Sequence, residues 1–185
     1  MIIINESTKT HKNKDIKIFT DGSTFNNQAK DKSKTRAGVG VFFGDKDKRN
    51  ISFSLNKKKN GKDIYKKTNQ VAEILAIIMA IETVIKTELI KKRTIIIYTD
   101  SMYCINSITK WGKNWEKNNW KKSNGKTVEN LELMKKMYYL ANNLKVRMVH
   151  VRAHKKEPKK DDPTYFTWYG NMMADKLATT ASSKF

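Results

Sequence analysis

The chain has 185 residues, of which 38% are hydrophobic and 30% charged, a balance typical of one globular domain rather than a disordered protein. No apolar run approaches the ~20 residues of a transmembrane helix, and the first ten residues lack the basic start and long apolar stretch of a signal peptide. The single cysteine, Cys104, excludes an internal disulfide and favours a reducing compartment, so we expect the cytoplasm or nucleus.

The net charge is +20, from 38 lysine and arginine residues against 18 aspartate and glutamate residues. Such a field attracts polyanions, and nucleic acid is the leading candidate. Only five of the 38 basic residues are arginine, however, and the chain is also rich in isoleucine and asparagine. An AT-rich genome would produce the same bias without selection for binding, so the charge indicates nucleic acid only together with the motifs below.

Hydrophobic periodicity predicts short strands first, then alternating helices and strands. Residues 14–20 alternate as a strand does, and we expect Asp21 and Gly22 to end it. The other expected elements are strands at 37–43 and 50–55, a helix at 68–86, a strand covered on both faces at 94–99, helices at 101–111 and 128–144, a strand at 145–151, a charged loop at 155–163 and a helix at 171–182. This order predicts an α/β domain with a mixed five-stranded sheet flanked by helices, spanning residues 14–185 after a short N-terminal extension at 1–13.

Two aspartates occupy matching positions, Asp21 in IFTDGS and Asp100 in IYTDS, each directly after an apolar strand. If the two strands are parallel neighbours, about 4.8 Å apart, their carboxylates converge at the edge of the sheet where α/β proteins place their sites. Close carboxylates recruit a hard divalent cation, which means magnesium or manganese. The alternative is that both residues merely end their strands as turn formers.

Two further acids are weaker candidates when each is considered alone. Glu73 lies in the apolar helix QVAEILAIIMAI, where a carboxylate needs a partner or an exposed first turn that the helix dipole favours. Asp175, in GNMMADKLA, lies near the start of the last expected helix, where a single aspartate is ordinarily solvated.

Four motifs in order, TDGS, TNQVAEILA, YTDS and GNMMADKLA, resemble the type 1 ribonuclease H family, and AGVGV and TDSMYCINSITKW are similar to its eukaryotic-style enzymes. The resemblance implies a ribonuclease H-like fold and an endonuclease that hydrolyses the RNA strand of RNA–DNA hybrids, leaving 5′-phosphate and 3′-hydroxyl ends. It implies that Asp21, Glu73, Asp100 and Asp175 are catalytic and bind two Mg²⁺ ions, for which Mn²⁺ can substitute. One ion would activate a water and the other stabilise the leaving 3′ oxygen.

His154, in HVRAHKK, resembles a catalytic histidine in a flexible loop of the family, where it would move protons or help the product leave. Without the family, an ordinary surface histidine is the plainer interpretation, and His150 on the preceding strand is expected to be structural. The chain departs from the family here, with Ala153 in place of the usual glycine and residues 155–169, KKEPKKDDPTYFTWY, inserted before Asp175.

The resemblance further implies contacts to both strands of a hybrid. RNA is distinguished by its 2′-hydroxyl groups, which Asn and Gln side chains can read because they carry donors and acceptors. The RNA-binding positions implied are Asn27, Asn69 and Gln70, and the DNA- and phosphate-binding positions are Lys66, Thr68, Asn130, Trp111, Trp115 and Ser123. Lys66 stands where relatives have arginine, so it lacks the bidentate grip. The alternatives are cap roles for the asparagines and core roles for the tryptophans, which we expect for Trp120.

Three other functions fit parts of this pattern, because one fold hosts several activities. An integrase-like enzyme would use carboxylates and magnesium on DNA, but it does not need the TNQ or tryptophan-rich segments. An inactive hybrid-binding module has usually lost an acid, whereas all four are present, and a basic scaffold protein would not carry four ordered motifs. The resemblance implies a monomer that binds RNA–DNA hybrid, and we expect no obligatory protein partner and no membrane association.

Overall fold

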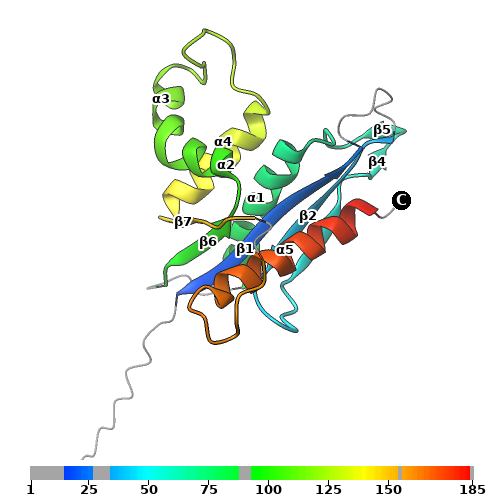
Figure 1. The fold of residues 1–185 in the computed structure, drawn as a ribbon. Coiled ribbons are helices and arrows are strands. Elements are labelled where there is room, and N and C mark those ends of the chain that lie inside the picture. Colours follow the sequence, from blue (N-terminus) through cyan, green and yellow to red (C-terminus); the bar gives the residue numbers. More distant parts are fainter. Residues whose placement is uncertain (1–14, 27–33, 88–92, 154–155, 184–185) are drawn as a thin grey trace, which may run out of the picture.

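The computed structural model describes residues 15–26, 34–87, 93–153 and 156–183 (Figure 1). Its centre is a five-stranded sheet with the strand order β3-β2-β1-β6-β7. The strands of this sheet are β1 (Ile16–Phe25), β2 (Arg36–Phe42), β3 (Ile51–Ser54), β6 (Ile95–Thr99) and β7 (Arg147–His150). The helices are α1 (Asn69–Thr87), α2 (Met102–Asn106), the π-helical turn η2 (Ser107–Trp111), α3 (Gly112–Lys117), α4 (Leu131–Asn143) and α5 (Tyr165–Ser183).

The sheet is mixed, as the sequence predicts. β1 pairs antiparallel with β2, and β2 with β3, whereas β6 lies parallel to β1 on one side and to β7 on the other. The antiparallel strands therefore occupy one side of the sheet and the parallel strands the other. β1 and β6 are the parallel neighbours that the two aspartate motifs require.

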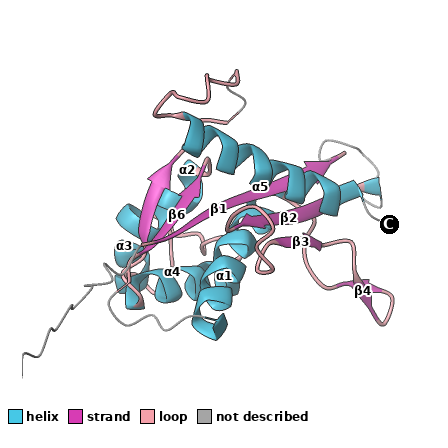
Figure 2. Ribbon diagram, turned by 90° about the horizontal axis from the view of Figure 1, so that it is seen from below, coloured by secondary structure: helices cyan, strands magenta, loops and turns pink. Residues whose placement is uncertain are grey.

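Helices cover both faces of the sheet, with α5 on one side and α1 and α4 on the other (Figure 2). The side chains of β6 are apolar on both faces of the sheet, and each face therefore needs a cover. Ile95 and Ile97 pack into the core beneath α1, while Ile96 and Tyr98 pack on the α5 side. Full burial of such side chains contributes about 1.5–3 kcal/mol each. Phe19 also packs on the α5 side, and side chains alternate along a strand, so Asp21 is directed to that same face.

The first strand continues past the residues that the sequence predicts as its end. Asp21 and Gly22 lie inside β1, which pairs with β2 as far as Phe25, whereas its pairing with β6 stops at Phe19. The expectation of a strand end at Asp21 is therefore wrong on the β2 side. The pairing with β2 runs through both residues, and the Gly22 amide donates a hydrogen bond to Asp21 Oδ1 at 2.8 Å, which removes the need for a turn.

The last helix begins at Tyr165 rather than at residue 171, so the end of the inserted segment is helical. Asp162 Oδ1 accepts a hydrogen bond from the backbone N–H two residues further on at 2.7 Å, just before the helix begins. The Phe166 ring lies 5.3 Å from that of Phe19 and 6.0 Å from that of Tyr98. These aromatic contacts give the added turns an apolar surface to cover, which the sequence period does not reveal.

The basic segment between β3 and α1 contains a small hairpin, β4 (Lys58–Lys59) and β5 (Lys62–Asp63), where the sequence indicates only a loop. Asn60 and Gly61 connect its strands with φ angles of 51° and 74°. Both angles are left-handed, as a tight two-residue hairpin turn requires. The hairpin lies at the end of the molecule remote from α3 (Figure 1).

Candidate active site

A close approach of α1 to β1 brings Glu73 near Asp21. Gly22 faces α1, where an added Cβ would lie 2.6 Å from the Glu73 amide nitrogen and 2.8 Å from the Ala72 Cβ. Any side chain at this position would push the helix away from the strand, because protein interiors are close-packed. The glycine of the TDGS motif therefore positions the carboxylate of the second motif.

A second close approach positions Asp175 on the opposite face. Gly40 pairs with Asp21 across the β1–β2 ladder. A Cβ at Gly40 would collide with the carbonyl oxygen of Ala174 and lie 2.7 Å from the amide nitrogen of Ala178. Helix α5 thus lies directly on the backbone of β2 at the level of Asp21, and Asp175 is the residue that follows Ala174.

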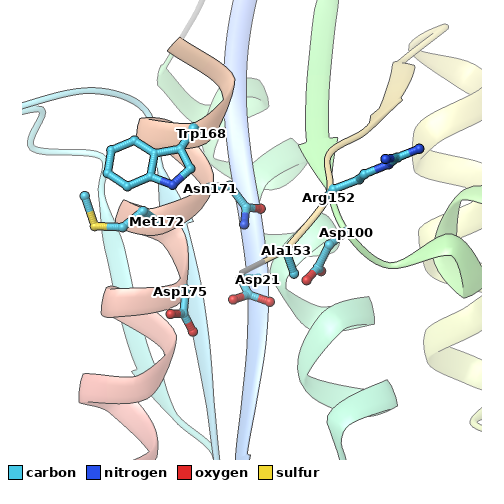
Figure 3. Close-up of a pocket in the computed structure, with 8 residues that line it drawn as sticks. All are labelled: Asp21, Asp100, Arg152, Ala153, Trp168, Asn171, Met172 and Asp175. Carbon is cyan, nitrogen blue, oxygen red and sulfur yellow. The ribbon is translucent and has the colours of Figure 1, made fainter. Parts of the chain in front are cut away.

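Asp100 reaches the same place from the end of β6. Asp21, Asp100 and Asp175 line one cavity of about 130 Å³. Figure 3 shows their carboxylates gathered around this cavity from β1, from the end of β6 and from α5. The structure therefore brings together three of the four acidic residues that the sequence singles out.

Glu73, the fourth acid, is held beside them by two hydrogen bonds. Asn69 Nδ2 donates to Glu73 Oε1 at 2.6 Å, and Ser101 Oγ donates to Glu73 Oε2 at 2.5 Å. Ser101 also caps α2, because its Oγ accepts a hydrogen bond from the Cys104 amide at 3.3 Å. These are the partners that a carboxylate in an apolar helix needs.

Burial first, and repulsion between the carboxylates second, set the electrostatics of this group. Asp21 is only 9% exposed. This burial, together with the Asp100 and Asp175 carboxylates, raises the pKa of Asp21 to about 8. Burial also raises the pKa of Glu73, which the hydrogen bond from Ser101 opposes. At neutral pH such a group favours a bound proton or a bound cation.

The donor set suits a hard divalent cation, because magnesium and manganese prefer carboxylate oxygens. Asn171 adds a neutral oxygen to the cavity wall: it is 8% exposed, and its Oδ1 has no hydrogen-bond partner within the described residues. Within the same residues, no three acidic, histidine or cysteine side chains already stand close enough to form a ready-made metal site.

A second cavity, of about 390 Å³, gathers the residues that the family resemblance assigns to phosphate and RNA. It is lined by Lys66, Thr68, Asn69, Gln70, Glu129 and Asn130. Asn130 Nδ2 donates a long hydrogen bond of 3.4 Å to Gln70 Oε1. Because Asn69 also donates to Glu73, this cavity is coupled directly to the carboxylate group.

The tryptophan-rich segment divides into exposed and buried parts. Trp111 is 37% exposed and lies 5.7 Å from the partly buried Trp115, measured between ring centroids. Trp120 is 6% exposed and packs against Tyr138, which agrees with the structural role expected for it. Ser123 lies on the exposed turn that follows.

Comparison with known proteins places these features in one family. The RNase H family model matches residues 13–183. The chain is 35% identical to a ribonuclease H of Schizosaccharomyces pombe over 167 residues, which are 90% of this chain and 53% of that protein. It is 37% identical to a ribonuclease H of Wigglesworthia glossinidia brevipalpis over 149 residues, 80% of this chain and 82% of that protein.

The chain belongs to the ribonuclease H family. The family resemblance drawn from the four motifs is thereby confirmed. The solved RNase H domain of PFV shares the fold, with a TM-score of 0.62, 23% identity and coverage of 90% of this chain and 93% of that domain. The chain spans about half the length of the Schizosaccharomyces pombe relative.

Two residues that the ribonuclease H resemblance implies, Asn27 and His154, lie outside the described residues. Ala153, which directly precedes His154, lines the carboxylate cavity. The roles expected for Asn27 and His154 stay predictions.

Sequence reasoning missed four residues on the cavity wall: Arg152, Trp168, Asn171 and Met172. Trp168 and Asn171 precede Asp175 by seven and four residues, a spacing that places all three on one face of a helix. Asn171 already lay in the expected helix at 171–182, whereas Trp168 would have been placed on its face only if that helix had been predicted to begin earlier. Ser101 stood in the YTDS motif but carried no signal of its own.

Replacing Ser101 with alanine is expected to lower the free energy of unfolding by about 1 kcal/mol, the usual cost of losing an N-cap hydroxyl. The change also removes the hydrogen bond that lowers the pKa of Glu73, so Glu73 should titrate at higher pH. Urea unfolding measures the first effect, and a carboxyl-resolved NMR titration measures the second. Ser101→Thr keeps the hydroxyl, so its free energy of unfolding and its Glu73 titration should stay near those of the parent. An alanine variant of unchanged stability would contradict the capping role.

Proposed function

We propose that this protein is an endonuclease that hydrolyses the RNA strand of RNA–DNA hybrids. The observation that carries the proposal is the single cavity lined by Asp21, Asp100 and Asp175 in a chain of the ribonuclease H family. The same activity is supported by the two relatives described above, each of which is named ribonuclease H. The expected products carry 5′-phosphate and 3′-hydroxyl ends.

We further propose that Asp21, Glu73, Asp100 and Asp175 hold two Mg²⁺ ions, which Mn²⁺ can replace. The raised pKa of Asp21 supports this, because a cation would relieve the repulsion among its neighbours. Such ions, when bound, supply activation of the attacking water and stabilisation of the leaving 3′ oxygen. Gly22 and Gly40 hold the helices that carry Glu73 and Asp175 against β1 and β2.

The remaining residues are proposed to bind the substrate and to move protons. Asn27, Asn69 and Gln70 would read 2′-hydroxyls on the RNA strand, since their side chains offer donors and acceptors. On the DNA strand, Lys66, Thr68 and Asn130 would hold a phosphate, and Trp111, Trp115 and Ser123 would line the channel. His154 would transfer protons or assist product release, because histidine changes charge near neutral pH.

The catalytic domain is proposed to span residues 14–185 and to act as a monomer on hybrid, without an obligatory protein partner. We propose the cytoplasm or nucleus as its location, from the single cysteine. Within the described ranges, none of the helices combines the length and apolar character needed to cross a membrane.

A strand-labelled cleavage assay tests the proposed function. The protein would receive RNA–DNA hybrid, duplex DNA and duplex RNA in parallel, each with magnesium or with a chelator. We expect cleavage of only the RNA strand of the hybrid, and only with magnesium. The products should carry 3′-hydroxyl and 5′-phosphate ends, which a ligase can rejoin. Cleavage of duplex DNA would instead favour an integrase-like enzyme, and tight hybrid binding without cleavage would favour an inactive module.

Cleavage is expected to need a run of ribonucleotides rather than a single one. The physical reason is that Asn69 and Gln70 line one cavity beside Glu73, and with Asn27 they would read several successive 2′-hydroxyls. Duplexes with one, two or more embedded ribonucleotides, all of one sequence, measure the requirement as kcat/KM. Efficient cutting at an isolated ribonucleotide would show that these residues do not act together.

A further inference from the structure

A second hollow adjoins the carboxylate cavity on the side of β7. It has a volume of about 300 Å³ and shares two lining residues, Arg152 and Trp168, with the carboxylate cavity. Lys156, Thr164 and Thr167 also line it. Four of these five residues, all except Arg152, belong to the inserted segment 155–169, so the insertion forms much of the wall of this hollow.

Helix α5 connects the hollow to the chemistry. Trp168, Asn171, Met172 and Asp175 line the carboxylate cavity at helical spacing, so that the indole lies two turns before Asp175 on the same side of α5 (Figure 3). Arg152 lies across the cavity, on the segment that follows β7. Arg152 and Trp168 therefore border both the carboxylate cavity and the hollow.

The hollow has the chemistry of a nucleotide site. Arg152 and Lys156 are exposed cations, which suit a phosphate, and the half-buried indole of Trp168 offers an apolar wall. In a duplex the base faces are stacked on each other, so the accessible apolar surface of a flanking nucleotide is its sugar. Beside the hollow, on the wall of the carboxylate cavity, the Asn171 Oδ1 lacks a hydrogen-bond partner among the described residues. A ligand carrying a donor, such as a ribose hydroxyl, would satisfy it.

We propose that this hollow is a subsite for the nucleotide next to the scissile phosphate in the strand that is cut. Its backbone phosphate lies between Arg152 and Lys156, and its sugar packs on Trp168. The proposal rests on the proposed function, because it places the cut strand at the carboxylates. The insertion thereby lengthens the grip on the RNA strand beyond the reacting phosphate.

The test compares variants on hybrids of different lengths. A short run of ribonucleotides within a DNA strand fixes the position of the cut. Three hybrids are then compared: one of full length, and two in which the cut strand is shortened, on one side or on the other, to the nucleotide next to the cut. Arg152→Gln and Trp168→Ala are compared with Trp168→Phe, which keeps an aromatic wall, and with Lys86→Gln, which loses the same charge at the far end of α1. The dissociation constant is measured in chelator, and KM and kcat are measured in magnesium.

On the full-length hybrid, Arg152→Gln and Trp168→Ala should each raise the dissociation constant and KM about tenfold, near the lower end of the effects seen for aromatic contacts to nucleotides, while kcat changes little. Shortening the cut strand on one of the two sides should weaken hybrid binding by the parent protein, so that its dissociation constant and KM become equal to those of both variants. Trp168→Phe and Lys86→Gln should remain near the parent.

Equal losses on all three hybrids would show that Trp168 and Arg152 act only on the structure, and wild-type affinity in both variants would show that the hollow binds nothing. Either result overturns the subsite. If the parent cleaves no hybrid at all, the proposed function fails, while the dissociation constants still decide whether the hollow binds a flanking nucleotide.

Discussion

Replacing Asp21 with asparagine is expected to abolish hybrid cleavage and, at the same time, to raise the melting temperature of the metal-free protein. Asp21 lies between the other acids, and its pKa of about 8 reflects burial and the repulsion of Asp100 and Asp175. Asparagine is nearly the same size but removes the charge, so the fold should persist while metal binding and turnover are lost. Asp100→Asn is expected to act in the same direction.

The stability effect has a defined pH dependence. The folded protein binds the Asp21 proton more tightly than the unfolded chain, whose pKa is near the ordinary 3.8, so Asp21 lowers the stability of the fold progressively as pH rises from about 4 to about 8. The gain from Asp21→Asn should therefore be absent in acid and largest above pH 8. Each pKa unit corresponds to about 1.4 kcal/mol, which moves the melting temperature of a domain of this size by roughly 3–6 °C.

Thermal melts across this pH range, in chelator and in magnesium, measure the effect. Magnesium should stabilise the parent more than the variant, because only a protein that binds the ion gains from it. Asp161→Asn removes the same charge from an exposed loop and serves as the control. Normal turnover by Asp21→Asn would contradict a mechanism that depends on the carboxylates. An unchanged melting temperature at high pH would contradict a destabilising charge on Asp21.

The parts of the fold that could be predicted are those encoded by local patterns. The alternating and continuous apolar runs gave the five strands of the sheet, and the repeated aromatic-Thr-Asp sequence indicated that Asp21 and Asp100 converge. The end of β1 could not be predicted in the same way, because the residues after Asp21 are held by pairing with β2. In that register Asp21 lies opposite Gly40, nineteen residues further along the chain, and only the fold brings the two together. The identity of a turn-forming pair such as Asp-Gly does not reveal such a partner.

The parts of the site that could not be predicted depend on packing between distant segments. Phe166 helps α5 to begin early because it meets Phe19 and Tyr98, and neither contact is visible in the spacing of the inserted segment. Trp168 was consequently expected in a loop and not on the helical face of Asp175. Arg152 was passed over for its neighbour His154, since the histidine carried the family resemblance and the arginine did not.

Changing Lys113, Lys117 and Lys121 together to glutamine is expected to weaken hybrid binding and to flatten its dependence on salt. All three lysines are exposed, on or just after α3, beside the tryptophan pair Trp111 and Trp115. A cation that neutralises a phosphate releases counterions, and each such contact adds ~0.9 to the slope of log affinity against log salt on B-form DNA. Loss of three contacts should therefore reduce the slope by up to about 2.7, and by somewhat less on a hybrid.

Lowered net charge alone would also weaken binding, so the decisive control removes the same charge elsewhere. Lys46, Lys48 and Lys86 are exposed and lie outside the α3 segment, the first two in the loop between β2 and β3 at the opposite end of the molecule (Figure 1). Changing these three to glutamine leaves the net charge equal to that of the α3 triple variant but removes no expected phosphate contact. Dissociation constants from low to high salt should then show a flattened slope only for the α3 variant. If both variants, or neither, lose slope, the lysines beside α3 make no special contact, and the high lysine content reflects composition rather than a DNA-binding channel.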